Sequence, residues 1–282
     1  MSERIQLAVV QFSMGDDVAA NIGRSSQLVA EAAARGAQIV LLPELFASRY
    51  FPRETEAASF ELAEPTEQSR VVQAMRVLAA TYRLVIPVSY FERDGEGFYN
   101  SVVVFDADGA ELGRYRKSHI PDGPGYEEKH FFKPGDTGFR TFQSRHGRIG
   151  VAICWDQWFP ECARAMALMG ADLLLYPTAI GSEPVRSEVD TSAAWRRVMI
   201  GHAVANTIPV AAANRVGDEG GQLFYGTSFI ADGRGETLTE LSRSEEGIAI
   251  AALDLGAWRQ EREWFGLVRD RRPDLYGKLV ER

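Results

Sequence analysis

The chain has 282 residues, of which 45% are hydrophobic and 25% are charged, a composition typical of globular proteins. At this length it can bury a core large enough to fold without disulfide bonds or structural metal ions. Its formal net charge of −8 argues against nucleic acid or an anionic membrane as its partner, and we expect neither.

The first third of the chain alternates strand and helix patterns. The dense apolar run Ile5–Phe12 predicts a strand that is covered on both faces. Asp16 and Asp17 are N-cap candidates for a helix that ends near Arg35. We expect the buried face of this helix to be formed by Ile22, Ser26, Val29 and Ala33. A second buried strand, a helix and a third strand follow over Gln38–Leu42, Glu67–Tyr82 and Leu84–Glu92.

The rest of the chain mixes hairpins with further strand and helix repeats. Hairpins are predicted by the strand pairs Asn100–Phe105 with Glu111–Arg116 and Phe139–Gln143 with Arg148–Ile153. The later elements are helices near Pro160–Met169 and Thr191–Asn206, strands at Asp172–Tyr176, Pro209–Ala213 and Ile248–Leu253, and a hairpin around Asp232. This pattern predicts mixed sheets with helices outside, a layered α/β sandwich. No linker divides the sequence, so we expect a single domain over residues 1–282.

Three chemically complementary residues come just after predicted strands: an acid, Glu44, an amine, Lys117, and a thiol, Cys154. In α/β proteins, reactive groups gather beyond the carboxyl ends of strands. Taken singly, each has a plain structural interpretation, as a capping carboxylate, a solvated lysine or a packing thiol. Their shared position predicts that they form one site. Cys162, inside a predicted helix, is interpreted as a packing residue.

The three groups together fit acyl transfer through a cysteine nucleophile. A cysteine attacks as the thiolate, a nearby ammonium lowers the pKa of the thiol, and a carboxylate takes its proton. The ammonium also stabilises the oxyanion of a tetrahedral intermediate, where one such donor contributes about 3 kcal/mol. The carboxylate then returns the proton to the leaving group as a general acid.

Motifs of other enzyme classes are missing from the sequence. It has neither the Gly-x-Ser-x-Gly elbow of serine hydrolases nor a phosphate-binding glycine loop. The histidines lie outside the spacings of known metal sites, so we expect no metal ion and no cofactor. A Cys–His dyad stays open as an alternative, with His119, His130, His146 and His202 as candidates.

Signals for export or membrane insertion are not seen either. The first ten residues place charges inside their apolar run, unlike a signal peptide. No window approaches the ~18–20 apolar residues of a membrane span. With only two cysteines, which suits a reducing compartment, these features predict a cytoplasmic protein.

The runs that hold the three residues resemble the motifs of a known enzyme family. They are Leu42–Leu45, Tyr115–Pro121 and Gly150–Asp156, and they resemble the Glu, Lys and Cys motifs of the nitrilase superfamily of carbon–nitrogen hydrolases. The resemblance runs from Ile5 to about Leu279. It implies a Glu-Lys-Cys triad and an α/β fold, a four-layer αββα sandwich of mixed sheets. It also implies homo-oligomers, as dimers or larger assemblies, with a tail from about residue 256 used in assembly.

Further segments are most similar to the branch of this superfamily that hydrolyses N-carbamoylputrescine. They are Tyr176–Pro184, Trp195–Ala203, Ala213–Arg215, Gly226–Ala231 and Arg269–Tyr276. The resemblance implies a small carbamoylated amine as substrate and putrescine, carbon dioxide and ammonia as products, in polyamine biosynthesis. In the segment before Gly135-Asp136, Glu128 rather than Glu127 matches the second glutamate of the family, which orients Lys117 and the substrate amide.

Four residues are candidates for binding the substrate. Glu183, seven residues after Tyr176, is expected to bind the distal ammonium of a carbamoylated diamine. Backbone N–H groups of Trp155 and Ala179 are expected to hold the oxyanion, and Tyr50 to line the pocket. Glu183 as an exposed loop acid and Tyr50 as a structural tyrosine stay open.

Two other functions also stay open. One is another amidase or ureidase of the superfamily, acting on β-ureidopropionate or an ω-amide, which requires a cationic side chain for the carboxylate of the substrate. The other is a catalytically silent member that binds a small molecule or a partner protein. The complete set of reactive residues argues against the silent member.

Overall fold

The computed structural model describes residues 4–186 and 188–281. Its first layer of strands has the order β14-β1-β2 followed by β3-β4-β5. The two halves meet where β2 runs beside the start of β3, through a parallel bridge between Ile39 and Val85. The strands are β1 (Arg4–Gln11), β2 (Ile39–Leu41), β3 (Ile86–Asp94), β4 (Gly97–Phe105), β5 (Glu111–Arg116) and β14 (Gly247–Asp254).

The second layer is a six-stranded sheet with the order β13-β12-β9-β8-β7-β6. Its central strands β7, β8 and β9 are parallel, and antiparallel strands complete both edges. A separate hairpin is formed by β10 and β11. The strands are β6 (Thr141–Ser144), β7 (Gly147–Val151), β8 (Leu173–Pro177), β9 (Val210–Ala213), β10 (Val216–Asp218), β11 (Leu223–Tyr225), β12 (Phe229–Ala231) and β13 (Thr237–Glu240).

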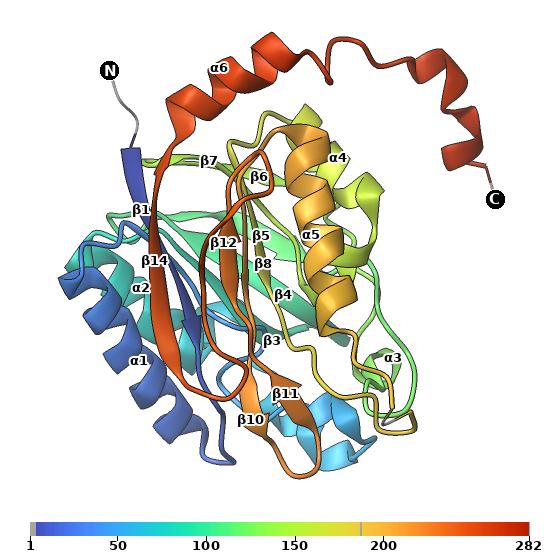
Figure 1. The fold of residues 1–282 in the computed structure, drawn as a ribbon. Helices are drawn as coiled ribbons and strands as arrows, with labels where there is room; N and C mark the ends of the chain where they lie inside the picture. Colours follow the sequence, from blue (N-terminus) through green and yellow to red (C-terminus); the bar gives the residue numbers. More distant parts are fainter. Residues whose placement is uncertain (1–3, 187, 282) are drawn as a thin grey trace.

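Helices cover the outer face of each sheet (Figure 1). On one side lie α1 (Val18–Ala34) and α2 (Arg70–Tyr82), and on the other α4 (Pro160–Leu168) and α5 (Ser192–Asn206). The architecture is therefore the four-layer αββα sandwich of mixed sheets that the sequence predicted. No helix in the described ranges is long and apolar enough to cross a membrane.

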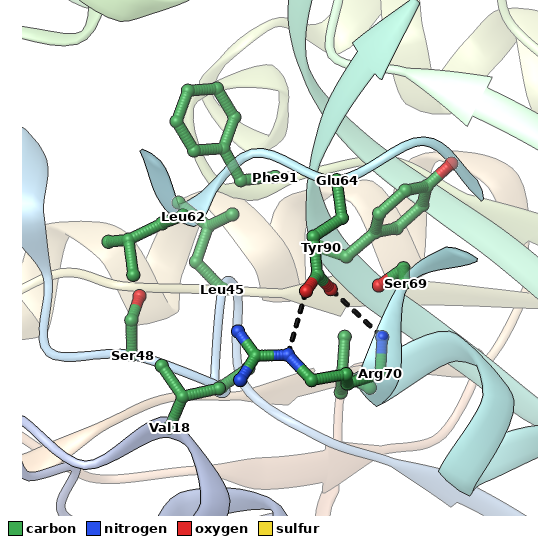
Figure 2. A pocket seen from close by; sticks show the side chains of 11 residues that line it. Val18, Leu45, Ser48, Leu62, Glu64, Ser69, Arg70, Tyr90 and Phe91 are labelled. Carbon is green, nitrogen blue, oxygen red and sulfur yellow. Dashed lines mark hydrogen bonds and ion pairs between the residues drawn. The ribbon is translucent and has the colours of Figure 1, made fainter. Parts of the chain in front are cut away.

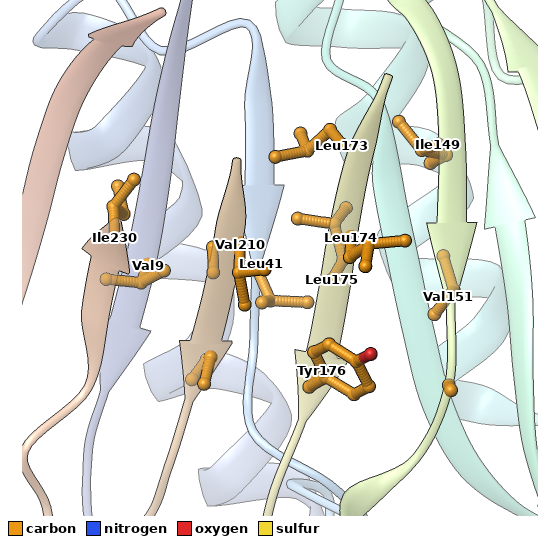
Figure 3. Close-up of a cluster of buried hydrophobic side chains, with 14 of the residues drawn as sticks. Val9, Leu41, Ile149, Val151, Leu173, Leu174, Leu175, Tyr176, Val210 and Ile230 are labelled. Carbon is orange, nitrogen blue, oxygen red and sulfur yellow. The ribbon is translucent and has the colours of Figure 1, made fainter. Parts of the chain in front are cut away.

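Alternate residues of β1 face two different cores, which explains the apolar run Leu7–Val10 in the middle of the strand. Leu7 and Val9 pack between the two sheets, whereas Ala8 and Val10 pack toward α1 and α2. Figure 3 shows part of the core between the sheets, with Val9 among strands of both layers. Because both faces of the strand are buried, no polar residue interrupts its middle.

The first helix begins as predicted, and its buried face is displaced by about one position from the predicted one. Asp17 caps α1 by accepting from the N–H of Ala19 at 2.8 Å. The fully buried positions are Asn21, Ser25, Leu28, Val29 and Ala32. Of the predicted stripe, Val29 is among them, and Ile22 and Ala33 are partly buried and pack against the same core. The reason is Asn21, whose amide donates to Gly15 O and Ala47 O at 2.8 and 3.1 Å. A polar side chain thus occupies a core position, which the apolar pattern did not reveal.

The chain ends with α6 (Leu255–Phe265) and a segment that extends away from the sheets (Figure 1). Several large apolar side chains of this region are exposed to solvent, namely Trp264, Phe265, Leu275, Leu279 and Val280. Exposed apolar side chains gathered in one region are characteristic of surfaces that another protein covers.

Candidate active site

The structure brings together the acid, the amine and a second acid that the sequence singled out. Lys117 lies just beyond β5 and Glu44 just beyond β2. The Nζ atom of Lys117 is 2.8 Å from Glu44 Oε1 and 2.6 Å from Glu128 Oε2. All three side chains are fully buried, so one ammonium is shared by two carboxylates away from water.

Glu128 belongs to the short helix α3 (Glu128–Phe131), which the pattern of the sequence did not predict. Its second oxygen, Oε1, accepts a hydrogen bond from the hydroxyl of Tyr50 at 2.7 Å. Tyr50 therefore lies behind Glu128 and reaches the site through it. Both oxygens of Glu128 are occupied, one by Lys117 and one by Tyr50.

The two oxygens of Glu44 are unlike each other. Oε1 accepts from Lys117 and also from the side-chain amide of Asn100 at 2.6 Å. Oε2 is buried and has no hydrogen-bond partner among the residues that the structure describes. Glu44 thus has one oxygen held in place and one available as a proton acceptor. Asn100 was missed from the sequence because it was assigned to a strand, as the first residue of Asn100–Phe105, and not to a position that follows one.

Cys154 follows β7 and opens a tight 3₁₀ turn, Cys154–Trp158. Its φ angle is 41°, a left-handed conformation that typically costs a side-chain-bearing residue about 1–3 kcal/mol. Asp156 holds this turn, because its carboxylate accepts from the N–H of Ile153 at 3.0 Å and from the hydroxyl of Tyr115 at 2.7 Å. The thiol points toward the carbonyl of Ala179, with a distance of 3.6 Å between Sγ and O.

The electrostatics of the cluster keep the resting thiol protonated. Burial raises the pKa of Cys154 well above its ordinary value, and the carboxylate of Glu44 adds to this, while Lys117 opposes it. Burial also lowers the pKa of Lys117, but the carboxylates of Glu128 and Glu44 more than offset burial and leave that pKa raised. A buried thiol of this kind needs an acceptor for its proton before it can attack.

A cavity of about 380 Å³ opens beside Cys154. Trp155, Ala179 and Glu183 line it, as does Tyr126, and Tyr50 is not among the lining residues. The complete lining is Pro121, Asp122, Gly123, Pro124, Tyr126, Glu128, Cys154, Trp155, Trp158, Ala179, Ile180, Glu183, Val185 and Thr191. The charged side chains in this set are all carboxylates, so a positively charged group is favoured inside.

A second cavity, lined in part by Leu45, is much smaller. Figure 2 shows it beside Leu45 and Tyr90, with the ion pair between Glu64 and Arg70 at its edge. Its volume of about 30 Å³ has room for a water molecule and no substrate. The larger cavity is therefore the one that can serve the reactive residues.

Tyr126 holds one wall of the larger cavity and was not predicted. Its hydroxyl accepts from the N–H of Gly181 and from the side chain of Gln222, both at 3.0 Å. Tyr126 also packs edge-on against Tyr50, with 5.9 Å between the ring centroids. Tyr126 therefore connects the backbone at Gly181, in the cavity wall after Ala179, with Tyr50, whose hydroxyl donates to Glu128.

Two of the histidines considered as partners of Cys154 are engaged elsewhere. His119 lies 2.8 Å from Asp156 through its Nδ1 atom and stacks on Phe159. His202 lies 2.7 Å from the carbonyl of Gln157 through its Nε2 atom. Within residues 4–186 and 188–281, no cluster of three or more His, Cys, Asp or Glu side chains is placed to hold a metal ion.

Residues 6–263 match the carbon-nitrogen hydrolase family. The chain belongs to this family. The N-carbamoylputrescine amidase of Arabidopsis thaliana is 49% identical over 98% of this chain and 95% of its own. The citrullinase of Francisella tularensis is 46% identical over 99% of both chains. The crystal structure of a carbon-nitrogen hydrolase from Helicobacter pylori G27 covers 99% of both chains, with a TM-score of 0.92 at 36% identity.

Glu128 gives the stability of the protein a dependence on pH. Burial raises its pKa to about 7, with Lys117 opposing the increase and Glu44 adding to it. Below that pH the folded protein holds a proton that the unfolded chain releases at the ordinary pKa of a glutamate. Stability therefore falls as the pH rises from about 5 to about 7. Glu128→Gln cannot ionise, so its melting temperature should fall less over this range than that of the parent.

The control for this measurement is Glu127→Gln, next in the chain and outside the three-group cluster. It should keep the pH slope of the parent protein. Equal slopes in the parent and in Glu128→Gln would contradict the assignment of the slope to Glu128.

Proposed function

We propose that this carbon-nitrogen hydrolase converts N-carbamoylputrescine to putrescine, carbon dioxide and ammonia. The observation that carries the proposal is the cavity beside Cys154, whose charged lining residues are Asp122, Glu128 and Glu183. N-carbamoylputrescine combines a neutral ureido group with a distal ammonium. The ureido group suits the buried cysteine, and the ammonium suits a carboxylate nearer the mouth. The likeness to N-carbamoylputrescine amidases of plants supports the same substrate.

The first half of the reaction forms a covalent intermediate. Glu44 takes the thiol proton on its free oxygen while Sγ of Cys154 attacks the ureido carbon. Lys117 and the backbone N–H groups of Trp155 and Ala179 stabilise the oxyanion. When this tetrahedral intermediate collapses, the bond to the terminal nitrogen breaks. Glu44 returns the proton, so ammonia leaves and a carbamoyl thioester remains.

The second half consumes one water molecule. Glu44 takes a proton from the water, whose oxygen attacks the thioester carbon. The carbon–sulfur bond breaks and the thiol regains its proton from Glu44. The released carbamate then loses carbon dioxide to give putrescine. Glu128, with both oxygens bonded, orients Lys117 throughout.

Citrulline is the second candidate substrate, because a citrullinase is also a close relative. Citrulline carries the same ureido group and an ammonium at the same place along its carbon chain, so the two compounds differ only in the α-carboxylate of citrulline. That carboxylate and the one of β-ureidopropionate need a cationic partner, and the residues that line the cavity include no Lys, Arg or His. Placing an unpaired carboxylate beside Glu183 is repulsive, so the diamine is favoured.

The nucleophile can be tested with a reagent that does not depend on the substrate. We expect iodoacetamide to label one thiol per chain, at Cys154, and to abolish ammonia release. Cys154→Ser should lose at least about 10³-fold in kcat and also the labelling, because serine is the weaker nucleophile at this site. Cys162→Ser, which alters a buried thiol in α4, is the matched control and should retain both. Near-normal turnover by Cys154→Ser would contradict the mechanism.

Substrate choice can be tested with a panel of carbamoylated compounds. Ammonia release should be fastest with N-carbamoylputrescine and much slower with citrulline and N-carbamoyl-β-alanine. Glu183→Gln should raise KM for N-carbamoylputrescine about tenfold with little change in kcat, because a charge-assisted contact contributes about 1.5–3 kcal/mol. Glu188→Gln, on the same loop and paired with Arg186, is the control. Equal KM values for the parent and Glu183→Gln would remove Glu183 from the binding site.

We further propose that the chain works as a homo-oligomer in the cytoplasm. Both cysteines are free thiols, which suits a reducing compartment. The exposed apolar residues of α6 and the segment after it suit a surface shared between copies. Ending the chain after Phe265 should lower the number of copies per assembly, obtained by dividing the mass measured by sedimentation by the mass of the shortened chain. An unchanged number of copies would show that the segment after α6 does not carry the assembly.

A further inference from the structure

Arg215 is a fully buried arginine in the connection between β9 and β10, outside the cavity lining. Its guanidinium donates to three backbone carbonyls of the turn that carries Glu44. Nε and Nη2 bond the carbonyl of Glu44 at 3.2 and 2.8 Å. Nη2 also bonds the carbonyl of Leu45 at 2.7 Å, and Nη1 that of Ser48 at 3.1 Å. The side chain of Arg215 therefore binds the backbone of the turn at three positions between Glu44 and Ser48.

Glu219 completes the arrangement and extends it to Tyr50. Its Oε2 atom accepts from Arg215 Nη1 at 2.6 Å and from the backbone N–H of Tyr50 at 2.8 Å. The Tyr50 hydroxyl in turn donates to Glu128. The buried pair of Arg215 and Glu219 thus reaches both carboxylates beside Lys117, one through the backbone of Glu44 and one through Tyr50.

The turn at Glu44 needs this support. The preceding strand β2 has only three residues, and Leu45 adopts a left-handed φ of 50°. Buried carbonyls must find donors, and Arg215 supplies them for Glu44, Leu45 and Ser48. Leu45 also borders the small cavity of Figure 2, so packing on that side is incomplete.

Arginine is suited to this task in a way that lysine is not. Its planar fork presents five N–H donors in a fixed geometry, and here it binds three carbonyls and a carboxylate. A lysine at the same position keeps the positive charge beside Glu219. Its single ammonium nitrogen cannot reach all three carbonyls and the carboxylate at once. The exchange therefore separates the charge of the residue from its geometry.

We propose that Arg215, together with Glu219, is a positioning residue that fixes Glu44 and Tyr50 relative to Lys117 and so sets the efficiency of proton transfer from Cys154. This inference rests on the roles proposed above for Glu44, Lys117 and Cys154. It assigns Arg215 no contact with substrate. It predicts a loss in the chemical step rather than in binding.

The variant that tests this is Arg215→Lys in the full chain. We expect kcat to fall at least about tenfold while KM stays within about threefold, because small misplacements of reacting groups cost up to about 10²-fold. Alkylation of Cys154 by iodoacetamide should slow in parallel, since it also requires removal of the thiol proton. If Arg215 has a purely structural role, Arg215→Lys lowers the melting temperature. At temperatures well below that melting temperature, where the variant is folded, alkylation of Cys154 is then as fast as in the parent.

Two further variants keep the test decisive. Met75→Ala removes a buried side chain of α2 in the core on the helix side of the first sheet, and Met75 makes no contact with the cavity lining. It should lower the melting temperature and leave kcat and alkylation unchanged. Glu219→Gln retains Arg215 but removes its counter-charge, and should lower kcat and slow alkylation in the same way. It decides the question if Arg215→Lys does not fold.

The outcomes separate this inference from the proposed mechanism. If Glu44→Gln is inactive while Arg215→Lys and Glu219→Gln keep kcat and alkylation within about twofold of the parent, the positioning role is wrong and the mechanism stands. If Glu44→Gln itself retains normal turnover, the mechanism fails first. Losses in Arg215→Lys that Met75→Ala reproduces at equal melting temperature would also overturn the positioning role.

Discussion

The site depends on one buried ammonium held between two carboxylates. Removing one partner from a buried ion pair typically costs about 3–5 kcal/mol, so each member of the cluster requires the other two. The fold supplies them from separate elements: Lys117 after β5, Glu44 after β2 and Glu128 from α3. Because water is excluded, the remaining oxygens also need donors, and this requirement draws Tyr50 and Asn100 into the cluster.

The two carboxylates are chemically distinct, and their hydrogen bonds explain the difference. Both oxygens of Glu128 accept hydrogen bonds, one from Lys117 and one from Tyr50, so neither is directed at the thiol of Cys154 as an open acceptor. Glu44 keeps one buried oxygen without a partner among the described residues. An unpaired buried acceptor is costly in a finished structure, which makes it a place where a proton or a water molecule is bound in the course of a reaction. This asymmetry supports the proposal that Glu44, rather than Glu128, is the base.

The sequence revealed those parts of the site that follow apolar strands. Glu44, Lys117 and Cys154 could be located because a buried strand leaves a visible run and ends at a definite point. Glu128 could be assigned only by resemblance to a family, since its helix has four residues. Asn100 and Arg215 lie 56 and 171 residues from Glu44 in the chain, and no local pattern marks such contacts. The buried face of α1 is displaced by about one position from the predicted one for a similar reason, because the partners of Asn21 lie outside the helix.

The carboxylates in and beside the cluster outnumber its one ammonium, and this excess of negative charge affects both the reactive thiol and the choice of substrate. Burial is the main cause of the raised pKa of Cys154, and the two carboxylates of the cluster add to it while the one ammonium opposes it. A substrate carboxylate beside this cluster and Glu183 would add a further negative charge in a partly desolvated space. A distal ammonium instead compensates the excess, and it does so without approaching the reacting carbon. The cavity can therefore select the charge at one end of a substrate while the buried cluster acts on the neutral group at the other.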